Sequence, residues 1–172
     1  MPLGWAGFRP AEGKASTMSL DQQLPPTGSA SATTSTRHRV DAFYGRLFGW
    51  SVKWRGEQPF LALENGICAA TLPKINAGPV LARLAATGCR GPALALPTPH
   101  GRRVALLAET DGLIPPRAAL PRGVEILAWG ALLPLPVDAR RGDAGTEWLT
   151  APDPRERWLP SLSAVLAGIQ RG

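Results

Sequence analysis

The segment Thr98-Pro99-His100-Gly101-Arg102-Arg103 places an imidazole and two guanidinium groups in a short turn between two apolar runs. Such a turn can bind an anion, because backbone N–H groups and Arg side chains together can surround a phosphate or a carboxylate. The same pattern is also typical of an ordinary polar hairpin with exposed arginines. His100, Arg102 and Arg103 are therefore candidate ligand-binding residues, and a plain polar turn is the alternative.

Other patterns that carry chemistry are missing or weak. Glu109 and Asp111 have the spacing of a metal-binding pair, but they stand beside Gly112, where a solvated turn is the simpler interpretation. His38 and His100 are the only histidines, which excludes a zinc site made of three imidazoles. The sequence contains no Gly-x-Ser-x-Gly elbow, Walker-type loop or dinucleotide fingerprint. We therefore expect no metal and no cofactor.

The charge balance favours an anionic partner without requiring one. The chain has 19 basic and 13 acidic residues, a net charge of +6, and 16 of the basic residues are arginine, which binds phosphate bidentately. These arginines are scattered in pairs, whereas a nucleic-acid footprint is normally a dense cluster or a stripe. Nucleic acid is thus a candidate partner, and a solvated basic face is the alternative.

Compartment and membrane association follow from composition. Cys68 and Cys89, the two cysteines, cannot build a disulfide framework or a cysteine-rich zinc site. No run of about 18 apolar residues and no secretion signal is present. These features predict a cytoplasmic protein with no membrane partner.

The elements that must position the turn follow from hydrophobic periodicity. Residues 1–36 are rich in Ser, Thr, Ala, Gly and Pro, so we expect a disordered tail, followed by one domain over residues 37–172. Helical spacing predicts three helices, at 37–49, 77–87 and 159–169.

Short apolar runs predict about eight strands. The first three, joined in part by the hairpin signal Asn65-Gly66, should form a meander. The runs lie at 52–54, 60–63, 67–72, 93–96, 104–108, 124–129, 131–135 and 147–150. Together they predict an α+β domain in which three helices cover one side of a mostly antiparallel sheet.

Three motifs, in order, resemble the N-terminal domain of bifunctional DNA primase/polymerases. They are a helix that runs into Gly49-Trp50-Ser51-Val52, the turn and strand from Thr98 to Val104, and Gly123-Val124-Glu125-Ile126 followed by the glycine-rich turn and strand at 130–136. The similarity spans about residues 38 to 160. It implies a primase/polymerase-like fold and a nucleotide or nucleic-acid ligand, with Glu125 at a position resembling the third catalytic carboxylate.

Two departures from that family change the expected function. Where the family carries a metal-binding Asp-x-Asp, this chain has Ile67-Cys68-Ala69-Ala70-Thr71, and Val104 stands where the family has a histidine. Two magnesium ions cannot be held without those acids, so magnesium is expected only if a catalytic function is retained. The resemblance implies a catalytically degenerate binding or regulatory module. Its ligand would lie near Arg102 and Arg103, with Glu125 on an adjoining strand.

Two alternatives come from other classes of function. The run from Phe43 to Trp50 resembles a helix of glyoxalase/dioxygenase-type metalloproteins, which implies a metal-dependent enzyme. The second module and the facing His and Glu ligands of that family are not found in the sequence. The other alternative is a structural protein-interaction domain, with apolar surface near the C-terminal helix pairing with another chain.

Overall fold

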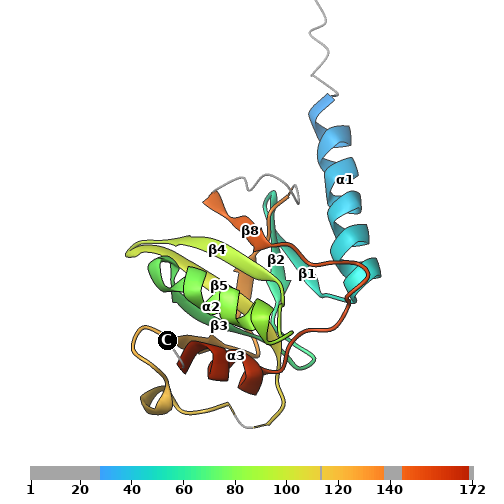
Figure 1. The fold of residues 1–172 in the computed structure, drawn as a ribbon. Helices are drawn as coiled ribbons and strands as arrows, with labels where there is room; N and C mark the ends of the chain where they lie inside the picture. Colours follow the sequence, from blue (N-terminus) through green and yellow to red (C-terminus); the bar gives the residue numbers. More distant parts are fainter. Residues whose placement is uncertain (1–27, 113, 138–144, 171–172) are drawn as a thin grey trace, which may run out of the picture.

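The computed structural model describes residues 28–112, 114–137 and 145–170, which form the α+β fold that the sequence predicts (Figure 1). All eight expected strands are present, and so are the three helices. In chain order the elements are α1 (Gly28–Asp41), the π-helix η1 (Ala42–Leu47), β1 (Val52–Arg55), β2 (Gln58–Ala62), β3 (Ile67–Pro73), α2 (Lys74–Ala86), β4 (Ala93–Thr98), β5 (Gly101–Glu109), the short 3-10 helix η2 (Arg117–Ala119), β6 (Glu125–Leu127), β7 (Leu132–Pro134), β8 (Glu147–Thr150) and α3 (Leu162–Gln170).

The strands form two antiparallel sheets rather than one. A three-stranded sheet has the order β1-β2-β7, and a five-stranded sheet has the order β6-β3-β5-β4-β8. The expected meander is therefore wrong, because β2 pairs with β7 while β3 pairs with β5 and β6. Asn65 and Gly66 do adopt the positive φ angles of a tight turn, 54° and 85°. Their turn carries the chain from one sheet to the other.

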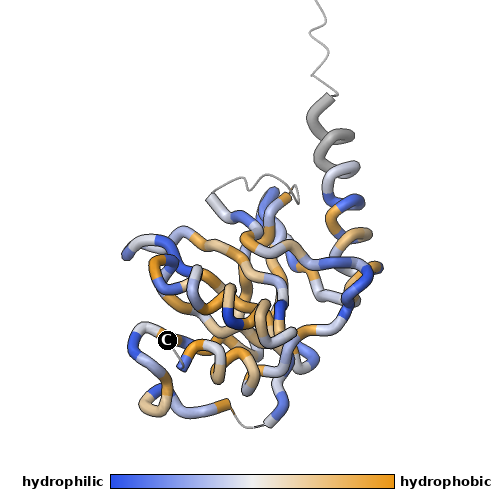
Figure 2. Tube along the Cα trace, viewed as in Figure 1, coloured by the Kyte–Doolittle hydropathy of each residue, from blue (hydrophilic) through white to orange (hydrophobic). Residues whose placement is uncertain are grey.

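The five-stranded sheet is the middle layer of the molecule. Ala70 and Leu106 belong to a buried cluster with α2 and α3, whereas Ala69 and Leu107 belong to a cluster with the smaller sheet and η1. Successive side chains on a strand point to opposite faces, so both faces of this sheet are covered. Figure 2 shows the resulting hydrophobic stretches along these strands. This burial explains why β3, β4 and β5 are apolar without alternation.

Two helices cover the central sheet, and α1 does not. Figure 1 shows α1 projecting from the molecule. Buried Val40 and Tyr44 anchor its last turn and η1, and Arg37 donates to the carbonyl oxygen of Gly56 over 2.6 Å. The helix begins at Gly28, so residues 28–36, for which composition predicts disorder, are helical; residues 1–27 lie outside the described residues. A polar helix extending into solvent has no apolar stripe, which is why periodicity does not detect its start.

An aromatic cluster joins η1 to β8. The rings of Tyr44 and Trp50 stack with their centroids 5.8 Å apart, and Trp148 donates its indole N–H to the Tyr44 hydroxyl over 3.0 Å. Trp50 is buried, and Trp54 and Trp148 are partly buried against the same cluster. Trp129 and Trp158 differ, since both are largely exposed.

The start of α3 is capped from two sides. Ser161 Oγ accepts a hydrogen bond from the N–H of Ala164, and Asp111 accepts from both the N–H and the hydroxyl of Ser163. Asp111 therefore fixes α3 to the end of β5. The hydrogen bonds from Ser163 lower the pKa of the Asp111 carboxyl below its ordinary value of 3.8.

A carboxyl group with a lowered pKa stabilises the folded state at neutral pH and stops doing so in acid. The contribution of Asp111 should be fully present above its unfolded pKa near 3.8 and lost as the pH falls through the lower folded pKa. We expect Asp111→Asn to lower the thermal unfolding midpoint at pH 6, and the difference from the wild type to shrink below about pH 4. A difference that stays constant down to pH 2 would contradict this assignment.

Gly91 is required by close packing. A Cβ atom at this position would lie 2.6 Å and 2.7 Å from two ring atoms of Pro160, which cannot move aside easily. We expect Gly91→Ala to reduce the free energy of unfolding by about 1–3 kcal/mol. Gly112→Ala is the matched control: apart from its chain neighbours, nothing lies within 4 Å of its Cβ position, and its φ is not in the left-handed region, so it should change stability by less than about 0.5 kcal/mol. Urea unfolding measures both, and equal stability of the two variants would refute the packing explanation.

Candidate basic site at one end of the central sheet

Strand register brings the chemistry-bearing residues to one end of the five-stranded sheet. Thr71 on β3 lies opposite Glu125 on β6, and Arg103 on β5 lies opposite Leu96 on β4, next to the Ala95–Glu147 pair. We name this end the basic rim. It consists of the cationic residues Lys74, Arg102, Arg103 and Arg117, together with Glu125 and Glu147.

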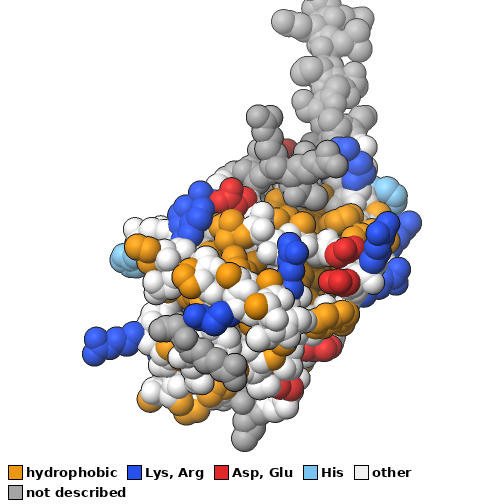
Figure 3. All heavy atoms as spheres, in the orientation of Figure 1, with side chains coloured by type: hydrophobic (Ala, Val, Ile, Leu, Met, Phe, Trp, Pro, Cys, Tyr) orange, Lys and Arg blue, Asp and Glu red, His pale blue; other side chains and the backbone are white. Residues whose placement is uncertain are grey.

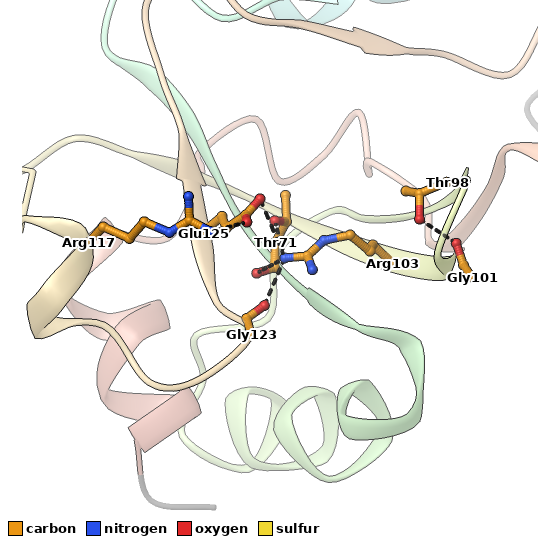
Figure 4. Close-up of polar contacts among 7 residues, drawn as sticks. All are labelled: Thr71, Thr98, Gly101, Arg103, Arg117, Gly123 and Glu125. Atoms are coloured by element: carbon orange, nitrogen blue, oxygen red, sulfur yellow. Dashed lines mark hydrogen bonds and ion pairs between the residues drawn. The ribbon is translucent and has the colours of Figure 1, made fainter.

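Arg103 lies at the centre of a polar cluster on the face toward the smaller sheet (Figure 4). Its Nη2 donates to the carbonyl oxygen of Thr71 over 3.2 Å, to the Thr71 hydroxyl over 2.9 Å and to the carbonyl oxygen of Gly123 over 2.8 Å. Gly123 has a φ of 77°, a conformation that favours glycine, and its carbonyl meets the guanidinium. Arg103 thus fastens the segment before β6 to strands β3 and β5.

Glu125 completes the cluster on the solvent side. Its Oε2 is 3.9 Å from Arg103 Nη2, and its Oε1 accepts a hydrogen bond from Arg117 over 2.9 Å. The structure therefore brings Arg103 and Glu125 together as expected, although β3 lies between their strands. Because the Arg117 side chain is 83% exposed, its ion pair with Glu125 is weak.

Arg102 points to the opposite face, toward the helices, because it precedes Arg103 on one strand. Its Nη2 donates to the carbonyl oxygen of Gly145 over 2.6 Å and lies 3.2 Å from Glu147 Oε1. Lys74 Nζ lies 3.2 Å from the same carboxylate oxygen. Arg102 and Arg103 therefore contact different partners on opposite faces of the sheet, although the sequence predicts one ligand near both.

His100 occupies the tip of the β4–β5 hairpin. Its side chain is exposed, and it has no hydrogen bond or ion pair to any other described residue. The Thr98 hydroxyl bonds to the carbonyl oxygen of Gly101 over 2.6 Å and closes the turn (Figure 4). The structure thus keeps His100 apart from the Arg103–Glu125 cluster.

The sequence analysis does not single out Lys74 and Glu147 of the rim, or Thr71, which contacts Arg103. Thr71 had a signal, since it is the single polar residue in the apolar run of β3, and it is 3% exposed. Lys74 and Glu147 had none, because their ion pair joins positions far apart in the chain.

Figure 3 shows basic side chains separated by apolar and uncharged surface on the face it displays. Arg140 and Arg141 lie outside the described residues.

β3 offers no acid to this end of the sheet. Cys68, Ala69 and Ala70 are fully buried, and burial raises the pKa of the Cys68 thiol to about 11, so it stays protonated at neutral pH.

Within residues 28–112, 114–137 and 145–170, no group of three His, Cys, Asp or Glu side chains is placed to hold a metal ion. In the same ranges, no helix has the length and apolar character that crossing a bilayer requires.

Comparisons with family models, curated proteins and solved structures found no match to this chain. The resemblances to primase/polymerases and to glyoxalase-type metalloproteins therefore stay predictions from short motifs.

Arg103 and Arg117 differ in what their loss should cost. Arg103→Gln leaves the buried Thr71 hydroxyl and the carbonyl oxygen of Gly123 without their hydrogen-bond donor. We expect a loss of about 1–3 kcal/mol in unfolding free energy. Arg117→Gln removes only an exposed ion pair and should change stability by less than about 0.5 kcal/mol. Urea denaturation of both variants tests this, and equal losses would show that Arg103 is not structural.

Proposed function

We propose that this protein is a non-catalytic binding module whose ligand carries phosphate groups, a nucleotide or a single-stranded nucleic acid, bound at the basic rim. The observation that carries the proposal is the charge at this end of the sheet, where four cationic side chains meet two carboxylates. An excess of positive charge raises the local concentration of phosphate-bearing ligands and their rate of association.

The rim cations divide into two roles under this proposal. Arg103 is a positioning residue, because its guanidinium is held by Thr71 and Gly123. Arg102 and Lys74 are the ligand-contacting residues: their side chains are 42% and 41% exposed, and they share one carboxylate oxygen of Glu147. Two cations on a single carboxylate retain a positive charge between them, and a phosphate oxygen is a fitting additional partner.

The non-catalytic part of the proposal rests on β3. Metal-assisted phosphoryl transfer needs carboxylates that hold the ions against the phosphates. At the positions where the primase/polymerase resemblance would require acids, β3 carries buried apolar side chains and Thr71, whose hydroxyl bonds to Arg103. A ligand at the rim would thus be bound and not transformed.

The test is binding of a fluorescently labelled single-stranded DNA, followed by anisotropy over a range of salt concentrations. The wild type should bind at low salt, and the affinity should fall as salt rises. The double variant Lys74→Gln, Arg102→Gln should bind more weakly, with its salt dependence reduced by about 1.4 in log–log slope, about 0.7 for each lost phosphate contact.

The matched control removes the same two charges from the smaller sheet. Lys53→Gln with Arg55→Gln alters β1 and should leave both affinity and slope unchanged. Absence of binding by the wild type at low salt, or equal weakening in both double variants, would refute a specific role for the rim.

A further inference from the structure

A groove of about 360 Å³ lies beside the basic rim, between the start of α2, the segment before β6 and the end of α3. Its walls include the rings of three prolines, Pro73, Pro79 and Pro121. Proline rings are rigid, so these walls are already formed before a ligand arrives, and little conformational entropy is lost on binding. The volume falls in the range of pockets that hold small molecules.

Ile75 lines this groove and is 88% exposed, the highest value among the exposed large hydrophobic side chains of the described residues. The buried residues of α2 are Ala77, Val80 and Leu84, which pack in the core cluster against the central sheet. Ile75 therefore contributes nothing to the core, although it carries as much apolar surface as a core residue. Such a side chain at a groove is a fitting contact for an apolar ligand.

Among the described residues, the charged side chains that line the groove have one sign. They are Arg83 and Arg122, and no Asp or Glu of the described ranges lines it. Arg122 makes no hydrogen bond or ion pair with any other described residue. Arg83 donates its Nε to the carbonyl oxygen of Gly168 over 3.0 Å, which orients the guanidinium and leaves its terminal nitrogens for another acceptor.

We infer that this groove binds a small amphipathic anion, an aliphatic carboxylate whose hydrocarbon chain packs against Ile75 and the prolines and whose carboxylate meets Arg122 and Arg83. The apolar walls fit a hydrocarbon chain. The two guanidinium groups, with no carboxylate among the described lining residues, fit a negative head group. This ligand differs from the phosphate-bearing ligand of the rim, and the inference does not rest on the proposed function.

Calorimetric titration with decanoate, below the concentration at which it forms micelles, tests the inference. The wild type should bind one decanoate per chain, and decyltrimethylammonium, which has the same chain and the opposite charge, should not bind. Ile75→Asn should weaken decanoate binding about tenfold or more, because it removes apolar contact at an exposed position that the core does not need. Arg122→Gln should weaken it about tenfold through loss of the charged hydrogen bond.

Two controls separate this site from the rest of the molecule. Ile114→Asn changes another exposed isoleucine, outside the groove, and should leave decanoate binding intact. The variant Lys74→Gln, Arg102→Gln should also keep decanoate binding, while Ile75→Asn should keep the DNA binding of the wild type, so failure at one site is distinguishable from failure at the other. Absence of decanoate binding by the folded wild type, equal binding of the cationic amphiphile, or binding of an acidic amphipathic peptide in place of decanoate would overturn the inference.

Discussion

Burial of the five-stranded sheet on both faces decides where polar chemistry can occur in this protein. Ala69 on β3 and Ala105 on β5 are fully buried under the smaller sheet, and Ala70 and Val104 are fully buried under the helices. A charge in the middle of these strands would lose its hydration without a partner, at a large cost in free energy. Charged side chains are therefore confined to the strand ends, where they form the basic rim.

The Arg103 cluster follows from this constraint. A guanidinium at the point where β5 emerges from the core can keep its charge partly exposed while it donates hydrogen bonds to groups at the buried edge. Its acceptors come from β3 and from the segment before β6. The hydrogen bonds of one side chain therefore hold these elements together at the edge of the apolar core. The segment before β6 also contains Pro121 and Arg122, which line the neighbouring groove. Arg103 therefore fixes a segment that shapes this groove.

Much of the fold was accessible from the sequence, because apolar runs and helical spacing are local signals. The buried residues Leu162, Val165 and Leu166 predict α3 directly. Strand partners were not accessible, since a strand that is apolar at every position fits any neighbour and gives no preference for one face. In the site, Arg103 and Glu125 were found, but the backbone carbonyl of Gly123 has no side-chain signal. The divergence of Arg102 and Arg103 was missed because both were assigned to a turn, whereas β5 begins at Gly101.

The position of α3 in the chain affects how the protein is made. α3 follows all eight strands in the sequence, yet its buried side chains Leu162, Val165 and Ile169 cover one face of β3 and β5. During synthesis the part of that face that α2 does not cover stays open to solvent until residues 162–170 have left the ribosome. A nascent or truncated chain that lacks them would present this apolar surface, the kind of surface that chaperones recognise and that drives aggregation.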